Sequence, residues 1–181
     1  MKRVLQTYRD GKSRKTPLTT YLLDGEQGNM QTLEAMASIV RHDRTQPDLR
    51  QFVLREIVKD ARGHDSRTEV QRIFEYARDR ITYRKDPFGV ERVADIWSTL
   101  YVLDNEGDCG IKSTFIATCC ALLGHKPYFV VIKQREKQTS FNHVYNMIVI
   151  DGSPVYLDAT PEYAPFGWQT NAVIRKLYPI F

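Results

Sequence analysis

The residues of this sequence that could do chemistry are a cysteine, a histidine and an aspartate, in that order. Cys109 follows a turn-forming Gly-Asp pair and precedes an apolar stretch, so we expect its thiol at the start of a helix. Unpaired N–H groups and the positive end of the helix dipole favour a thiolate there, which is the nucleophilic form of cysteine. His143 and Asp158 could supply a base and a group that orients it. The pattern predicts nucleophilic catalysis; a cysteine that only packs in the core is the alternative.

The dipeptide Asp151-Gly152 predicts how His143 and Asp158 lie relative to each other. It separates two β-rich runs and is typical of a two-residue hairpin turn. With this pair at the tip, Tyr145 faces Asp158, and His143 is a diagonal neighbour of Asp158 on the same face of the sheet. Diagonal neighbours have backbones roughly 7–8 Å apart, so the two side chains can reach each other. A slip of one residue would place them on opposite faces. Taken singly, each is also typical of a residue that only binds nearby backbone.

Composition limits the classes of protein that this chain can belong to. Its 181 residues are 42% hydrophobic and 27% charged, which is typical of one globular domain. No apolar run approaches the roughly 18 residues of a membrane span, and the first residues lack the apolar stretch of a secretory signal. Three cysteines, of which Cys119 and Cys120 are adjacent and expected to pack, form no disulfide framework or zinc-binding spacing. We therefore expect a cytoplasmic protein without a membrane partner, metal or cofactor.

Positive charge is concentrated at the N-terminus, where we expect a basic extended arm over residues 1–28. Residues 1–15 carry six basic side chains against one acidic, whereas the remainder carries 20 basic and 21 acidic. Such an arm could bind an acidic protein surface or, less readily, nucleic acid, since Tyr8 alone could stack on bases. A solvated tail is the alternative.

Helical periodicity comes first along the chain and strand patterns follow. The apolar spacing predicts helices over 30–42, 47–61, 66–81 and 111–122, a short helix near 93–100 within a long connection over 83–107, and strands over 18–23, 128–133, 143–150 and 154–158. Ser66-x-x-Glu69 matches a capping box at the start of the third helix. The expected fold class is α+β, with a helical N-terminal half and the nucleophile's helix packed on a small antiparallel sheet. One domain would span 29–181.

The motifs around the three candidate residues together resemble the transglutaminase-like superfamily, which has a papain-like core. They are Gly107-Asp108-Cys109, Asn142-His143-Val144-Tyr145 and Tyr156-Leu157-Asp158-Ala159-Thr160, preceded by a similar lead-in over 73–83. The resemblance covers residues 66–162, about half of the chain, and indicates a microbial or phage-type member. It implies that Cys109 is the nucleophile, His143 the general base and Asp158 the orienting carboxylate. It leaves residues 1–65 unexplained, and no pattern matches the calcium sites of the animal crosslinking enzymes.

The reaction that the resemblance implies is acyl transfer on an amide or ester. Cys109 would attack the carbonyl, His143 would protonate the leaving group, and water or an amine would resolve the thioester. The Cys109 backbone N–H and one side-chain donor would stabilise the oxyanion, with Trp97 and Asn105 as candidates for that donor. Lys112, in the first turn of the helix, could assist the thiolate by charge, although we expect an exposed helix lysine.

Two classes of function fit these observations. The first is a cysteine protease, amidase or transglutaminase-like acyltransferase that acts on a protein or peptide substrate. The second is a catalytically weak or inactive member of the fold that serves as a structural or interaction protein, for example in a phage particle. Its basic arm and aromatic tail (Trp168, Tyr178 and Phe181) would then join it to an assembly. The complete set of cysteine, histidine and aspartate favours the enzyme.

Overall fold

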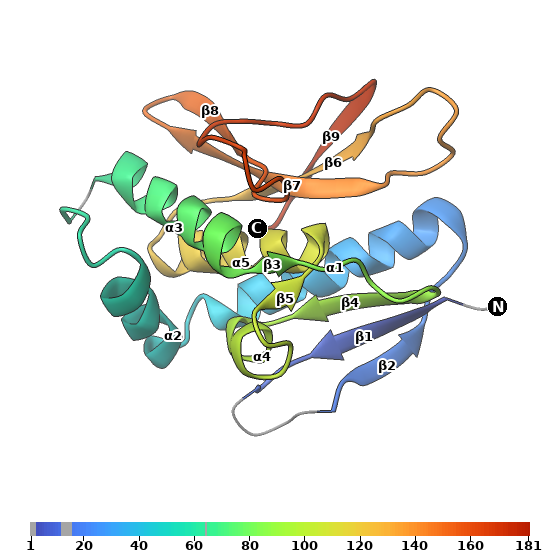
Figure 1. Cartoon of the computed structure of the whole chain (residues 1–181), viewed down its shortest axis with the longest axis horizontal. Coiled ribbons are helices and arrows are strands. Elements are labelled where there is room, and N and C mark those ends of the chain that lie inside the picture. The colour runs from blue at the N-terminus through green and yellow to red at the C-terminus, as the bar shows by residue number, and fades with distance from the viewer. Residues whose placement is uncertain (1–2, 12–15, 64) are drawn as a thin grey trace.

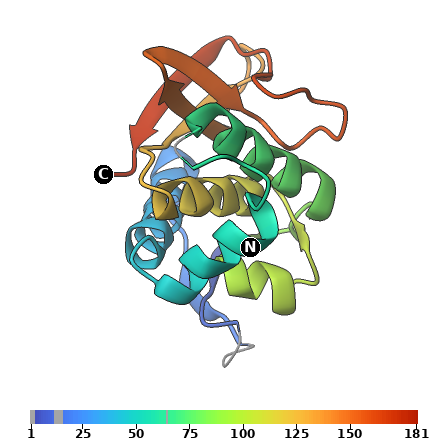
Figure 2. The same ribbon diagram turned by 90° about the vertical axis from the view of Figure 1, so that its left-hand side faces the viewer.

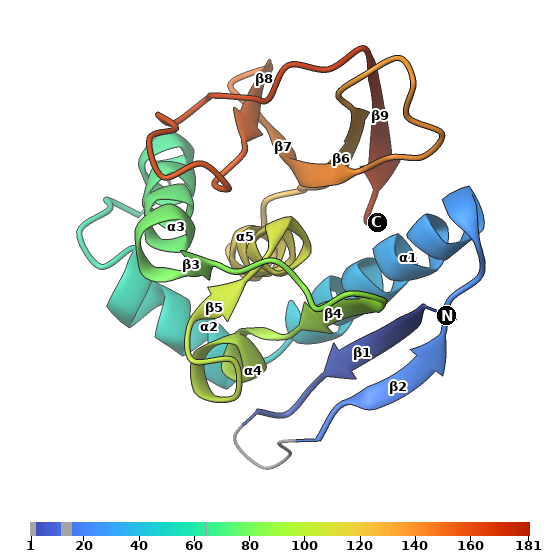
Figure 3. The same cartoon turned by 45° about the vertical axis from the view of Figure 1, so that its right-hand side comes forward.

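The helix that begins at Cys109 lies between two β-sheets, one on each side, and further helices surround it (Figures 1 and 3). The structure is a computed structural model that describes residues 3–11, 16–63 and 65–181. Its helices are α1 (Gly25–Asp43), α2 (Pro47–Phe52), η1 (Val53–Ile57), α3 (Ser66–Arg80), α4 (Ile96–Tyr101) and α5 (Cys109–Leu122). Its strands are β1 (Val4–Tyr8), β2 (Leu18–Tyr21), β3 (Thr82–Tyr83), β4 (Val90–Ala94), β5 (Glu106–Gly107), β6 (Tyr128–Lys133), β7 (His143–Ile150), β8 (Ser153–Leu157) and β9 (Ile174–Pro179). The fold class is α+β, as the sequence predicts.

Helix α5 is the buried centre of the fold because its sequence has apolar residues on more than one face. Twelve of its 14 residues are buried, and it packs on α1, α3, β4 and β7. Figure 2 shows it enclosed by the other helices. Its only charged side chain, Lys112, is buried as well, at 1% exposure, which makes the expectation of an exposed lysine wrong. Cys119 and Cys120 are fully buried packing residues, as predicted.

A four-stranded sheet of order β8-β7-β6-β9 covers one side of α5. Its β7–β8 hairpin has the predicted register, with Met147 opposite Tyr156 and Ile150 opposite Ser153. The turn residues Asp151 and Gly152 have φ angles of 51° and 76°, the left-handed backbone that this type of tight turn requires. The register prediction is therefore confirmed. β9, which pairs antiparallel with β6, is a strand that the sequence analysis did not identify.

A three-stranded sheet of order β2-β1-β4 covers the other side, and it includes part of the expected arm. β1 pairs in parallel with β4 and antiparallel with β2, and its Leu5 is buried at 5% exposure. Residues 4–8 are thus the central strand of a sheet, because an apolar side chain and two ladders of backbone hydrogen bonds hold them. The basic residues Lys2, Lys12, Arg14 and Lys15 lie outside the described residues.

Several helix boundaries differ from the sequence prediction. Helix α1 begins at Gly25 instead of residue 30, and α4 begins at Ile96 because residues 93 and 94 belong to β4. The second helix is regular only to Phe52 and continues as the π-helical turn η1 to Ile57, so it does not reach residue 61. The cap of α3 is Asp65, whose carboxylate accepts a hydrogen bond from the Thr68 backbone N–H at 3.0 Å. Ser66 is the first residue inside the helix and does not form the predicted capping box.

The aromatic residues of the C-terminal segment are largely engaged within the chain. Trp168 packs against the core cluster around α3 and α5. Tyr178 packs against the cluster around α1, and its hydroxyl donates to Glu34 at 2.7 Å. Phe181 is 48% exposed, with the Arg44 guanidinium over its ring. Within the described part of the chain, no helix is long and apolar enough to cross a membrane.

The burial of β1 gives the first prediction. We expect Leu5→Ala to lower the free energy of unfolding by about 2–4 kcal/mol, because it leaves a cavity in the core. Leu18→Ala in the neighbouring strand is the matched control: Leu18 is 64% exposed, and its truncation should cost no more than about 0.5 kcal/mol. Urea denaturation measures both. Equal losses from the two variants would contradict a core role for β1.

Candidate active site

A cleft of about 620 Å³ opens at the start of α5, between the two sheets. Its walls come from α1, Tyr83, residues 85–92, residues 108–110 and residues 140–144, with Arg3 and with Val131 of β6. Both Cys109 and His143 line it. Segments far apart in the sequence thus bring the predicted nucleophile and the predicted base to one solvent-accessible space.

Cys109 is the first residue of α5 and is half-buried. The helix is capped by Asp108, whose Oδ1 accepts hydrogen bonds from the backbone N–H groups of Gly110 and Ile111 at 2.9 and 3.2 Å. Burial, followed by the Asp108 charge, raises the pKa of the Cys109 thiol, while the Val144 backbone N–H lowers it. The net shift is upward, so the sulfur keeps its proton at neutral pH and does not stand as the thiolate that the helix start alone would favour. Cys109 therefore needs a base.

His143 and Asp158 meet as the hairpin register predicts. His143 Nε2 lies 2.7 Å from Asp158 Oδ2, and the Asp158 side chain is fully buried. Asp158 also accepts hydrogen bonds from the Thr170 hydroxyl at 2.6 Å and the Thr160 backbone N–H at 3.1 Å. Burial alone would raise the pKa of this carboxyl, but the hydrogen bonds from His143 and Thr170 hold it below its usual value. A buried, ionised carboxylate thus binds one ring nitrogen and leaves Nδ1 for another partner.

The two predicted side-chain donors for an oxyanion do not reach the cleft. Trp97 Nε1 donates to Asp48 Oδ2 at 3.1 Å, and the indole packs beside Phe52 and Tyr101. Asn105 lies in the turn before β5 with a left-handed φ of 58°. Neither residue is among the described residues that line the cleft. Sequence proximity to Cys109 therefore did not predict access to the cleft.

Tyr83 also lines the cleft, so its hydroxyl is a further candidate for the hydrogen-bond donor to an oxyanion. It was not among the donors predicted from the sequence. It ends β3, which pairs in parallel with β5 so that Tyr83 lies opposite Gly107, two residues before Cys109. Burial, and next the nearby Cys109, raise the pKa of its phenol, so the hydroxyl keeps its proton as a hydrogen-bond donor. The only sequence feature that could have pointed to Tyr83 is its position shortly after a helix. Nothing in the sequence indicated that β3 would pair with β5.

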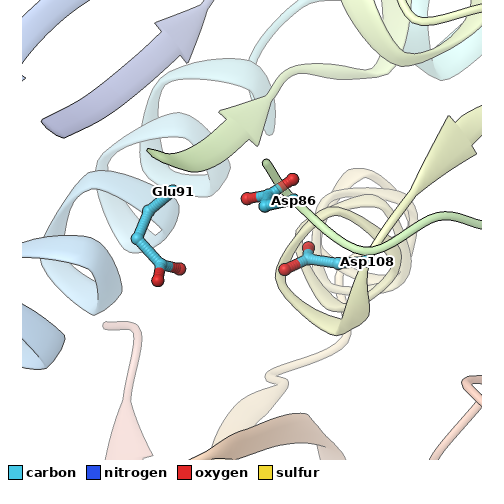
Figure 4. A group of neighbouring side chains, drawn as sticks. All are labelled: Asp86, Glu91 and Asp108. Atoms are coloured by element: carbon cyan, nitrogen blue, oxygen red, sulfur yellow. The ribbon is translucent and has the colours of Figure 1, made fainter. Parts of the chain in front are cut away.

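Three carboxylates, from Asp86, Glu91 and Asp108, point toward one another in the cleft beside Cys109 (Figure 4). Each offers an oxygen within 4.8 Å of the others, a spacing that could hold a metal ion. Within the chain, however, Asp86 binds Arg92 at 2.7 Å and Glu91 binds Arg3, so two guanidinium groups already balance two of the charges. Burial, followed by repulsion from Asp86, raises the pKa of Asp108 to about 7. Besides burial, the charges of two of these three carboxylates, Asp108 and Glu91, raise the pKa of the Cys109 thiol.

No family model and no curated protein matches this sequence. Solved structures similar to it include the putative cysteine protease from Cytophaga hutchinsonii, with 17% identity and a TM-score of 0.46 over 62% of this chain. Another is the putative protease from Parabacteroides distasonis, with 14% identity and a TM-score of 0.46 over 71% of this chain. The chain spans 37% and 26% of those proteins, respectively. Neither likeness is close enough to assign a fold family or a reaction.

The charge of Asp108 leads to a second prediction. We expect Asp108→Asn to raise the rate at which iodoacetamide alkylates Cys109 at pH 8, by roughly 3- to 10-fold, because removing the neighbouring negative charge lowers the thiol pKa. At that pH Asp108, with its pKa of about 7, is ionised in the wild type. An asparagine still caps the helix through its side-chain oxygen.

Peptide mass spectrometry measures this rate separately for each cysteine. Asp151→Asn at the exposed hairpin tip is the matched control and should leave the rate unchanged, since the cleft lining does not include that residue. An unchanged or lower rate for Asp108→Asn would mean that the Asp108 charge does not govern the thiol.

Proposed function

We propose that this protein is a cysteine-dependent acyl-transfer enzyme that acts on amide bonds of a protein or peptide through Cys109, His143 and Asp158. The observation that carries the proposal is the 2.7 Å contact between His143 and a buried Asp158, with His143 and Cys109 lining the same cleft. A nucleophile that starts a buried helix, with its base and its orienting carboxylate on an adjacent antiparallel sheet, supports a papain-like or transglutaminase-like core. The enzyme would be a protease, an amidase or a transglutaminase-like acyltransferase.

The first half-reaction follows from the protonation states. Because the Cys109 thiol carries its proton, His143 Nδ1 takes that proton as the sulfur attacks the carbonyl carbon. A carbon–sulfur bond forms, and the carbonyl oxygen becomes an oxyanion. As the oxyanion collapses, the carbon–nitrogen bond breaks and His143 returns the proton to the leaving amine. Asp158 holds the ring and stabilises the imidazolium that exists between these two transfers.

The second half-reaction releases the acyl group. The thioester on Cys109 is attacked by water or by a second amine, from which His143 removes a proton. The thiol regains its proton as the carbon–sulfur bond breaks. Water as the attacking group makes the enzyme a hydrolase, and a lysine side chain makes it a crosslinking enzyme.

Two donors would stabilise the oxyanion in this proposal. The first is the Cys109 backbone N–H, which starts α5. The second is the Tyr83 hydroxyl, which replaces Trp97 and Asn105 because it lines the cleft and they do not. A donor that keeps its proton and is held on a strand costs little reorganisation during the reaction.

An activated ester provides a third prediction that does not require the natural substrate. With p-nitrophenyl acetate, we expect release of p-nitrophenol and an acetyl group on Cys109, detected by peptide mass spectrometry. Cys109→Ala should abolish the adduct. His143→Ala should slow acetylation by about 10²–10⁴-fold, because the protonated thiol loses its base.

The matched control for this experiment is His42→Ala. His42 also binds an aspartate, Asp43, at 2.8 Å, but it does not line the cleft, so its variant should react like the wild type. The proposal fails if Cys109 is not acetylated, or if the His143 and His42 variants react at the same rate.

The role of Tyr83 is tested by removing only its hydroxyl. We expect Tyr83→Phe to lower kcat for the ester by about 10²-fold or more with little change in KM, because the oxyanion exists only along the reaction path. Tyr101→Phe is the control, since Tyr101 is 55% exposed on α4 and outside the cleft lining. A Tyr83→Phe variant that changes KM alone would make Tyr83 a binding residue instead.

A further inference from the structure

The helix that carries Cys109 also carries two buried polar side chains that donate hydrogen bonds to residues outside the helix. Lys112 and Ser113 are exposed by only 1% and 3%. The Ser113 hydroxyl donates to the Val144 backbone oxygen at 3.1 Å. The Lys112 ammonium group donates to the Ala159 oxygen at 3.0 Å and to the Arg78 oxygen at 3.3 Å. All these acceptors are carbonyls of segments packed around α5.

The hydrogen bonds to Val144 and Ala159 both reach a residue next to a member of the proposed catalytic set. Val144 directly follows His143, and Ala159 directly follows Asp158. Ser113 and Lys112 themselves come four and three residues after Cys109, within about one turn of the helix. One turn of α5 therefore contacts the backbone beside both other members of the proposed set.

Other hydroxyl residues of the same helix behave differently. The Thr114 hydroxyl donates to the Gly110 oxygen and the Thr118 hydroxyl to the Thr114 oxygen, both at 2.8 Å and both within α5. Such bonds to the preceding turn are the usual way for a buried helical hydroxyl to be satisfied. Ser113 instead bonds outside its own helix, so its contact joins α5 to β7.

Burial of Lys112 is costly for a side chain that serves packing alone. Burial lowers the pKa of its ammonium group to about 8, although Glu162, Asp79 and Asp158 favour the charged form. A buried charge rarely adds stability over an apolar side chain of similar volume, whereas it can fix one arrangement of its neighbours. Lys112 joins α3, α5 and the segment after β8 in this way.

We propose that Lys112 and Ser113 are positioning residues that hold Asp158 and His143 in line with Cys109. Lys112 acts through the carbonyl beside Asp158, and Ser113 acts through the carbonyl beside His143. The inference concerns the same site and rests on the proposed function for its kinetic consequence. Its structural consequence, the geometry of the His143–Asp158 pair, can be measured without any reaction.

The test compares Lys112→Met and Ser113→Ala with Thr118→Val, a control that removes a buried hydroxyl whose bond stays inside α5. We expect both positioning variants to lower kcat for p-nitrophenyl acetate by about 10-fold or more with little change in KM, because small displacements of reacting groups are costly. The control should keep the wild-type kcat. Ser113→Ala removes a single oxygen and keeps the test open if Lys112→Met does not fold.

An NMR measurement separates this inference from the proposed function. In the wild type, the His143 ring N–H proton shared with Asp158 should give a downfield signal that exchanges slowly with water. Lys112→Met and Ser113→Ala should shift this signal or speed its exchange, and Thr118→Val should not. Urea denaturation of all variants shows whether any change merely follows lost stability.

The outcomes are distinct. If wild-type Cys109 is not acetylated but the positioning variants still alter the His143 signal, the proposed function fails and the positioning role stands. If wild-type Cys109 is acetylated while both variants match Thr118→Val in kcat and in the NMR signal, the positioning role is overturned.

Discussion

The burial of α5, in which twelve of 14 residues are buried, is the constraint on which the rest of this structure depends. A helix enclosed on every side can place a reactive group in a cleft only at an end, and its N-terminal end is where Cys109 lies. Enclosure also means that each polar side chain along the helix must find a partner, because an unsatisfied buried polar group is costly. Lys112 and Ser113 find theirs in the segments that carry Asp158 and His143. The packing of the core and the geometry of the candidate site therefore follow from the same helix.

Electrostatics in the cleft favour general-base chemistry over a preformed thiolate. A helix start favours a thiolate, but here the cap itself is an acidic residue and the sulfur is poorly solvated. Both effects keep the proton on the sulfur until a base removes it. In the proposed function that base is His143, whose ring is held by a buried carboxylate and which lines the same cleft. The nucleophile of the proposed reaction is therefore protonated before the base acts, as the serine of a Ser-His-Asp triad is.

The polar contacts of the cleft also explain why its acidic cluster is tolerated. Asp86 and Glu91 are paired with Arg92 and Arg3, and Asp108 accepts hydrogen bonds from two helix N–H groups. Arg3 comes from the segment that leads into β1, so the N-terminal strand contributes to the cleft. The N-terminal segment, which the sequence predicted to be a separate arm, therefore forms part of the candidate site.

The sequence by itself determined the local features of this protein. The Asp151-Gly152 turn set the register of the β7–β8 hairpin, and with it the approach of His143 to Asp158, because alternation along two adjacent strands leaves a single arrangement. The apolar composition around Cys109 determined that its helix would be central. These features depend on residues close together in the chain, which is why periodicity and turn chemistry could predict them.

Only the tertiary structure decided what depends on distant segments. The pairing of β1 with β4 and of β9 with β6 joins segments that lie far apart in the chain. The β3–β5 contact brought Tyr83 to the cleft, whereas Trp97, nearer to Cys109 in sequence, packs elsewhere. Lys112 is the only charge in an apolar helix, yet its carbonyl acceptors lie in α3 and after β8. A hydrogen-bond partner across the core has no signature in local sequence, because it exists only after the segments have packed.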